Sequence, residues 1–253
     1  MMPPKINSKI IPWTIVMNLK YSIASLLIIL GSCSQYVNKN ESDSFDDAIY
    51  QYGTKDSFLS KKYVGQLSYK ELKNYGDMGL GTFNYVDGEM TALNGEFFRI
   101  PTDGPVHLAS DTFLTPLAIT KFFRTDKEIK TNSGIGIEEL KNLISASLTD
   151  TTKPIAFQIT GDFNFIKTRS VHKQSEPFLS LEQIVADQAV FQFENISATI
   201  VGFWFPKYMD GVNFPSYHFH VLTADLKGGG HLLDCKIKDA VVKIDYCDKL
   251  IIQ

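Results

Sequence analysis

Three of the chain's five histidines lie in one short segment, YHFHVLTADLKGGGHLLD, which runs from residue 217 to residue 234. His218 and His220 are separated by one residue, and His231 follows three consecutive glycines. A single histidine is more often a hydrogen-bonded core residue than a ligand. Three imidazoles on one face, however, can bind a metal ion and leave coordination positions for water or substrate.

The residues around the histidines predict the backbone that would bring the rings together. The stretch SYHFHVLT is aromatic and β-branched, which predicts a strand with His218 and His220 on the same face. The stretch TADLKGGG predicts a reversal of the chain, because glycine permits tight and close backbone paths. His231 would then begin the returning antiparallel strand beside the first two. An all-imidazole site suits zinc best, with iron, nickel and copper as alternatives.

Other elements are indicated by capping and turn residues. Short helices are expected over residues 57–65, from Ser68 to Gly76, and over residues 136–148. The second of these begins with a capping box, in which Glu71 follows Ser68 by three residues. Residues 79–104 read as β structure with tight turns at 87–88 and 94–95. The stretch IAFQITGDFNFIKTRSV alternates like strands around Gly161-Asp162.

The composition is that of a globular protein with a core: 44% hydrophobic residues, 21% charged residues and a net charge of −3. No basic block is present, which argues against a nucleic-acid partner. Strand patterns on both sides of a central helix predict an α+β fold. We expect two packed β-sheet-based units with a few helices, at residues 48–150 and 151–253. The C-terminal unit would carry the three-histidine metal site.

The first 33 residues predict a signal peptide of the lipoprotein type. An apolar run too short to span a bilayer follows Met17, which opens a better signal than Met1. The sequence Leu-Gly-Ser before Cys33 resembles a bacterial lipobox, in which the signal is cut before the cysteine and the thiol is lipidated. The alternative is an ordinary signal peptide with an incidental cysteine. Residues 34–47 read as a polar tether. We therefore expect an exported lipoprotein, anchored to the membrane and facing the periplasm or the cell exterior.

The two other cysteines, Cys235 and Cys247, lack zinc-ribbon spacing. Buried apolar thiols are the expected state. A disulfide is possible outside the cytosol but does not follow from the sequence.

The histidine segment, together with two further motifs, resembles the alpha-acetolactate decarboxylase family. YGDMGLGTFNYVDGEMTALNGEFFRIPTDG, at residues 75–104, is similar to the family's N-terminal signature, and KTRSV, at residues 167–171, to its arginine segment. The three motifs occur in the family's order and cover the chain from about Tyr50 onward. The resemblance implies decarboxylation of 2-acetolactate to acetoin with zinc, and a homodimer of chains built from two packed sheet-based units.

The resemblance also assigns roles to single residues. The three histidines match the family's zinc ligands. Glu89 matches an active-site acid, Arg169 the active-site arginine, and Thr82 a pocket-lining residue expected to bind substrate. Without the resemblance, Glu89 would be read as a solvent-facing turn residue, Arg169 as half of a surface ion pair, and Thr82 as an ordinary strand residue.

The implied reaction explains why residues of these types would be needed. Loss of carbon dioxide leaves an electron pair on carbon, which the neighbouring ketone of 2-acetolactate can accept, so no organic cofactor is needed. Zinc would act as a Lewis acid toward the substrate oxygens. Arg169 could hold the carboxylate with its fork of donors, and Glu89 is a candidate for the acid that delivers the proton of acetoin.

Two features depart from the family pattern. The family's C-terminal tail returns a glutamate to the zinc site, whereas this sequence stops at Gln253, within or just after an expected strand. Either the natural chain continues beyond this sequence, or the enzyme is weakened, or another acid substitutes. The 253-residue chain is expected to bind zinc but to turn over acetolactate slowly. His172 stands where the family tends to have proline, and neither His172 nor His107 is expected to take part in catalysis.

Two other functions are compatible with a His-x-His strand. Cupin-type oxygenases or sugar-binding modules use this motif but add a nearby glutamate, and the only acid close by here is Asp225. A non-catalytic metal-binding lipoprotein is the second alternative. An assay for the release of carbon dioxide from acetolactate, with and without a chelator, would distinguish these two functions from decarboxylation.

Overall fold

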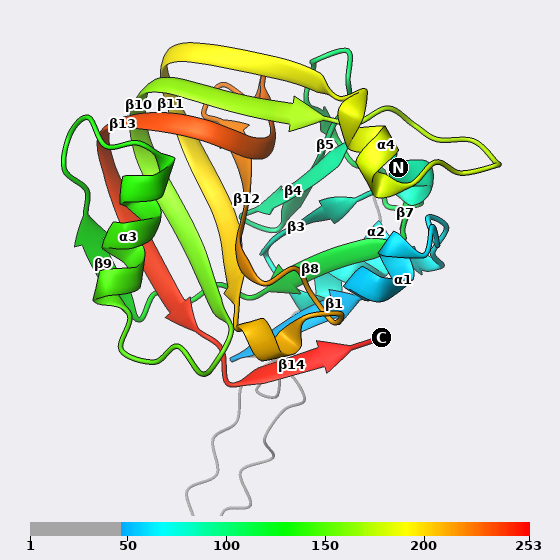
Figure 1. Ribbon diagram of the computed structural model, residues 1–253, viewed down its shortest axis with the longest axis horizontal. Helices are drawn as coiled ribbons and strands as arrows, with labels where there is room; N and C mark the ends of the chain where they lie inside the picture. The colour runs from blue at the N-terminus through cyan, green and yellow to red at the C-terminus, as the bar shows by residue number, and fades with distance from the viewer. Residues whose placement is uncertain (1–46) are drawn as a thin grey trace, which may run out of the picture. The chain divides into compact units, whose positions relative to one another are not determined.

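The computed structural model describes residues 47–253, whose strands form two main sheets (Figure 1). The seven-stranded sheet has the order β14-β1-β8-β3-β4-β5-β6. Its strands are β1 (Ala48–Tyr52), β3 (Met78–Thr82), β4 (Glu89–Leu93), β5 (Glu96–Ile100), β6 (His107–Leu108), β8 (Leu117–Lys121) and β14 (Lys249–Ile252). Its neighbours pair antiparallel, except that β14 lies parallel to β1. Strands β2 (Leu67–Ser68) and β7 (Leu114–Thr115) form a separate short pair.

The five-stranded sheet has the order β10-β11-β12-β13-β9. Its strands are β9 (Lys127–Lys130), β10 (Ile155–Ser170), β11 (Ala189–Phe205), β12 (Ser216–Thr223) and β13 (Gly229–Tyr246). Strand β10 pairs with β11 along one edge and with β13 along the other, so β10 to β13 close into a ring. Figure 1 shows β10, β11 and β13 running side by side.

Four short helices accompany the sheets in the described residues: α1 (Lys55–Leu59), α2 (Tyr69–Leu72), α3 (Ile137–Ser147) and α4 (Leu181–Ala186). Single 3₁₀ turns occur at Lys73–Tyr75, Asn84–Val86 and Lys207–Met209. The capping box predicted for α2 is present, because the Ser68 hydroxyl accepts from the Glu71 amide and the Glu71 carboxylate accepts from the Ser68 amide.

The helix expected over residues 57–65 is shorter and starts earlier than predicted. The side chain of Thr54 accepts a hydrogen bond from the Ser57 amide and so caps the first turn of α1. The helix ends at Leu59, and Lys61 then adopts a φ of 64°, which lies outside the helical region.

The two sheets face each other across a shared apolar layer. Ile49, Met78 and Ile119 of the seven-stranded sheet pack against Ala156, Val201, Phe203 and Phe205 of the five-stranded sheet. A second core lies within the ring of long strands, and α3 buries Leu140 and Ile144 against it. Burial of this apolar surface supplies the main driving force that joins the sheets.

The chain is mostly β-sheet with few helices, as the α+β expectation requires. Sheet membership does not follow a division at residue 150, however. Strand β9 and helix α3 precede that point and associate with the five-stranded sheet, whereas β14 joins the seven-stranded sheet. Segments of the two sheets therefore alternate along the sequence.

The alternating segment around Gly161 is one continuous strand, β10. A side chain at Gly161 would have its Cβ only 2.1 Å from the Asp239 carbonyl oxygen, because β13 lies directly alongside. The glycine here permits close approach of two strands.

Cys235 and Cys247 are buried free thiols, in agreement with the expectation from the sequence. Residues 1–46, which include Cys33, the signal and all but the last residue of the tether, lie outside the described residues. Among the residues that the structure does describe, no helix is long and apolar enough to cross a membrane.

A buried ion pair also joins the two sheets. The Lys121 Nζ of β8 lies 3.3 Å from the Asp245 Oδ1 of β13, with side chains 0% and 1% exposed. Asp245 also accepts a hydrogen bond from the Arg124 amide. Burial raises the pKa of Asp245 to about 7, against the opposing effects of the Arg124 amide and Lys121.

We expect Lys121→Met to lower the free energy of unfolding by about 3–5 kcal/mol, because it leaves a buried carboxyl without its cation. Chemical denaturation would measure the change. The matched control is Lys153→Ala, which breaks an exposed pair with Asp248 and should lower the free energy of unfolding far less. Equal losses in the two variants would contradict this prediction.

Candidate active site

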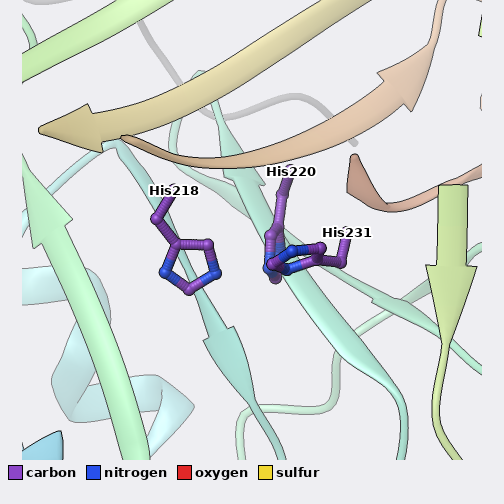
Figure 2. Close-up of side chains that lie close together, drawn as sticks. All are labelled: His218, His220 and His231. Carbon is purple, nitrogen blue, oxygen red and sulfur yellow. The ribbon is translucent and has the colours of Figure 1, made fainter. Parts of the chain in front are cut away.

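The three histidines converge between β12 and β13. His218 and His220 lie on β12, where the alternation of a strand puts both side chains on one face. His231 lies opposite His220 in the register of β12 and β13. The ring centroids are 5.2 Å apart for His218 and His220, 4.9 Å for His218 and His231, and 5.3 Å for His220 and His231. Figure 2 shows the three rings directed into one space.

The glycines before His231 explain how the strands come so close. A Cβ at Gly229 would lie 2.4 Å from the Val221 carbonyl oxygen, and one at Gly230 would lie 2.4 Å from the Arg169 carbonyl oxygen. Gly230 also has a φ of 118°, which favours glycine. These glycines let β13 approach β12 on one side and β10 on the other, and so place His231 beside His220 and Arg169.

The imidazoles are neutral and have free lone pairs. Burial lowers the pKa of His218 to about 4 and those of His220 and His231 well below the usual value, with Arg169 adding to each shift. His220 Nδ1 lies 2.7 Å from the Met90 carbonyl oxygen, so this nitrogen carries the proton and Nε2 carries the lone pair.

These imidazoles fit a metal ion. Neutral imidazole is the ligand form, and one ligand nitrogen from each ring lies within 4.8 Å of the others. His218 Nδ1 and His220 Nε2 are buried and have no hydrogen-bond partner among residues 47–253. Buried polar atoms without partners are costly in an ordinary core. Binding of an ion would satisfy both nitrogens.

A carboxyl group and a guanidinium group adjoin the histidines. The Glu89 Oε1 of β4 lies 3.5 Å from the Arg169 Nη1 of β10, and Glu89 Oε2 lies 3.5 Å from His220 Nε2. Both separations exceed the usual hydrogen-bond range, so each group retains capacity for another partner. Burial raises the pKa of Glu89 to about 7, although Arg169 opposes the shift. At neutral pH the carboxyl group is therefore available in both protonation states.

All of these groups line one cavity of about 290 Å³. Its ionisable lining residues are the histidines, Glu89 and Arg169, and Glu89 is the one carboxyl among the lining residues that the structure describes. The apolar lining comes from residues scattered over the chain: Phe58, Val86, Leu117, Val171, Leu181 and Phe214. The volume lies near the lower end for ligand sites, which suits a small molecule.

The structure also places the other residues considered from the sequence. Thr82 lines the cavity and is buried, and its hydroxyl donates to the Gly88 carbonyl oxygen at 2.7 Å. His107 and His172 are exposed and line no part of the cavity. The Met90 carbonyl and the apolar wall could not be predicted from the sequence, because no local motif marks a backbone acceptor or a residue contributed by a distant element.

The cavity combines an apolar wall, three convergent imidazoles, and a cation beside an acid with a raised pKa. Perturbed ionisable groups in a concave site are typical of enzymes. The arrangement is that of an enzyme site for a small anionic substrate, with a place for a metal ion.

Comparisons with known proteins agree with this class. The sequence pattern of the alpha-acetolactate decarboxylase family matches residues 49–253. An alpha-acetolactate decarboxylase of Methanosarcina mazei is 37% identical over 204 residues, which cover 81% of this chain and 71% of the relative. One of Bacillus subtilis is 32% identical over 210 residues, or 83% of this chain and 82% of the relative.

A solved structure gives the same result. The crystal structure of the Bacillus subtilis alpha-acetolactate decarboxylase aligns with a TM-score of 0.79 at 32% identity, over 81% of this chain and 88% of that chain. The chain belongs to the alpha-acetolactate decarboxylase family. The family inferred from the three sequence motifs is confirmed, and with it the enzyme class.

Proposed function

We propose that this chain decarboxylates 2-acetolactate to acetoin and carbon dioxide, with zinc bound by His218, His220 and His231. The observation that carries the proposal is the Glu89–Arg169 pair beside three neutral imidazoles in one small cavity. The cupin-type and non-catalytic alternatives find no support in the comparisons.

Arg169 has the geometry to bind the substrate. Its planar guanidinium can donate two parallel hydrogen bonds to a carboxylate. The side chain is only 14% exposed, so water competes weakly with the substrate. The bond from the carboxylate carbon to its neighbour breaks, carbon dioxide leaves, and the electron pair passes to the adjacent ketone oxygen. The Arg169 guanidinium then lies beside the negative charge that develops on the substrate.

Glu89 can supply the proton that completes the reaction. The carbon that lost carbon dioxide must gain one proton to become the carbinol carbon of acetoin. Burial raises the pKa of Glu89 to about 7, which favours the protonated form that a proton donor needs. The apolar wall restricts access of water to the same carbon.

Zinc is the metal that we propose for the site. Three nitrogen ligands suit zinc and leave coordination positions free for a substrate. When bound, zinc would supply Lewis-acid stabilisation of negative charge on the substrate oxygens. Iron, nickel and copper also accept imidazole ligands, and elemental analysis of protein purified without added metal distinguishes them.

Removal of the metal tests the proposal directly. We expect the purified chain to release carbon dioxide from 2-acetolactate, to lose this activity after chelation, and to regain it when zinc is added back. Gas release and acetoin formation would both be measured. Oxygen consumption with an organic substrate would instead favour the cupin-type alternative, and metal binding without any turnover would favour the non-catalytic one.

We also propose that the protein is an exported lipoprotein anchored through Cys33, and that it acts as a homodimer. The lipobox-like sequence supports the anchor, and the family resemblance supports the dimer, which a molar-mass measurement in solution tests. Cys33→Ala is expected to release the protein from membranes or to leave its precursor uncut. Cell fractionation and intact mass would show the change, with Cys247→Ala as the matched control. Unaltered membrane association and mass in Cys33→Ala would contradict the anchor.

A further inference from the structure

Thr82 lines the cavity, but its hydroxyl group donates its hydrogen bond to another group of the protein. The side chain is 5% exposed, and Oγ1 donates to the Gly88 carbonyl oxygen at 2.7 Å. That carbonyl belongs to the peptide bond between Gly88 and Glu89. Thr82 and Glu89 also stand opposite each other in the ladder of β3 and β4. The hydroxyl thus bonds to the backbone from which the Glu89 side chain projects.

Thr82 is itself held firmly. Its carbonyl oxygen accepts one hydrogen bond from the Tyr69 hydroxyl at 3.0 Å and another from the Thr115 hydroxyl at 2.7 Å. Tyr69 and Thr115 are both fully buried, and Tyr69 stands at the start of the capped helix α2. Because two buried hydroxyl groups donate to this one carbonyl oxygen, the backbone of Thr82 is held in place at the end of β3.

The turn that follows has a conformation that its own residues do not favour. Tyr85 and Val86 have φ values of 67° and 55°, in the region that disfavours residues with a Cβ. Gly88 has a φ of 88°, and a Cβ there would lie 2.6 Å from the Ile100 carbonyl oxygen. Contacts from outside the turn must therefore keep it in this shape. The Thr82 hydroxyl provides such a contact at the last turn residue before β4.

Two groups at the beginning of β4 contact the histidine site. The Glu89 carboxyl lies beside His220 Nε2 and Arg169, and the carbonyl of the next residue, Met90, fixes His220 Nδ1. A small displacement of this strand end would move the acid relative to the rings.

We propose that Thr82 is a positioning residue, whose hydroxyl anchors the Gly88–Glu89 peptide and thereby holds the Glu89 carboxyl against His220 and Arg169. This role differs from the substrate contact expected for Thr82 from the family motif. The catalytic consequence rests on the proposed decarboxylase function, whereas the anchoring does not.

Thr82→Val removes the hydroxyl and keeps the shape of the side chain. We expect kcat for acetolactate to fall by about 10²-fold, the loss typical of a catalytic group displaced by about 1 Å. KM should stay unchanged because Arg169 lies on β10, and bound metal should stay unchanged because all three histidines remain on β12 and β13. Thr82→Ser retains the donor and should restore kcat.

Thr91→Val is the matched control. Thr91 lies on β4, is fully buried, and its hydroxyl has no hydrogen-bond partner among residues 47–253. Removal of this hydroxyl should leave kcat unchanged. If Thr82→Val does not fold, the smaller Thr82→Ala replaces it in the comparison with Thr82→Ser.

Amide hydrogen exchange provides a readout that does not depend on turnover. We expect faster exchange in a peptide covering residues 83–93 for Thr82→Val, and wild-type exchange there for Thr82→Ser and Thr91→Val. Absence of decarboxylation in the wild type would overturn the proposed function, while the exchange result would still decide the anchoring. Unchanged exchange in Thr82→Val, or a raised KM with unaltered kcat, would overturn the positioning role.

Discussion

His220→Ala is expected to abolish both metal binding and turnover. Of the three histidines, His220 is the most buried, and its tautomer is fixed by the Met90 carbonyl so that Nε2 carries the lone pair. Removing the imidazole leaves two ligands, too few for the three-nitrogen site that we propose. Elemental analysis should show a fall from one equivalent of metal per chain to a small fraction, and acetoin formation should fall to background.

His172→Ala is the matched control for this variant. His172 is exposed, and its ring hydrogen-bonds to the Thr102 hydroxyl outside the cavity. Metal content and turnover should therefore match those of the wild type, and thermal unfolding would establish that both variants fold. Full metal content in His220→Ala would refute the three-histidine site.

Glu89→Gln should lower kcat by about 10²–10⁴-fold, the range for loss of a general acid. The amide keeps nearly the same volume but cannot donate a carboxylic proton. Bound metal should be retained, since Glu89 is no part of the three-histidine set. Steady-state kinetics with acetolactate, together with elemental analysis of the same preparation, would measure the separation of chemistry from metal binding.

Glu96→Gln provides the corresponding control, because Glu96 is an exposed residue of the neighbouring strand β5. Its kcat should equal that of the wild type. A wild-type kcat in Glu89→Gln would mean that the proton reaches the substrate from another group or from water. Loss of metal in Glu89→Gln would mean that the acid takes part in metal binding.

The histidine site could be predicted from local sequence because its geometry is local. Alternation along SYHFHVLT puts His218 and His220 on one face, and a glycine-rich reversal returns His231 beside them. The capping box of α2 and the helix α3 are equally local, and the structure contains both. Such patterns depend on neighbours a few residues apart, which a single sequence displays directly.

The approach of Glu89 and Arg169 to the rings could not be predicted from local pattern. Glu89 lies on the seven-stranded sheet and Arg169 on β10 of the other sheet, so the packing of two sheets brings them together. On its own, the turn beside Glu89 looked exposed, whereas the side chain is 8% exposed. The family resemblance suggested both residues, but their burial and its effect on the pKa of Glu89 required the tertiary structure.

Strand β14 lies beside β1, although nearly all of the described chain separates them in sequence. Closing such a long loop is entropically costly and slows folding, because non-local pairs form only after the intervening chain is ordered. Because β14 follows the strands of the five-stranded ring in sequence, its pairing with β1 ties the seven-stranded sheet to that ring. We therefore expect Glu89 and the three histidines, although on different sheets, to be lost in the same unfolding transition. A ligand held by the histidines consequently stabilises the strand that carries the acid as well.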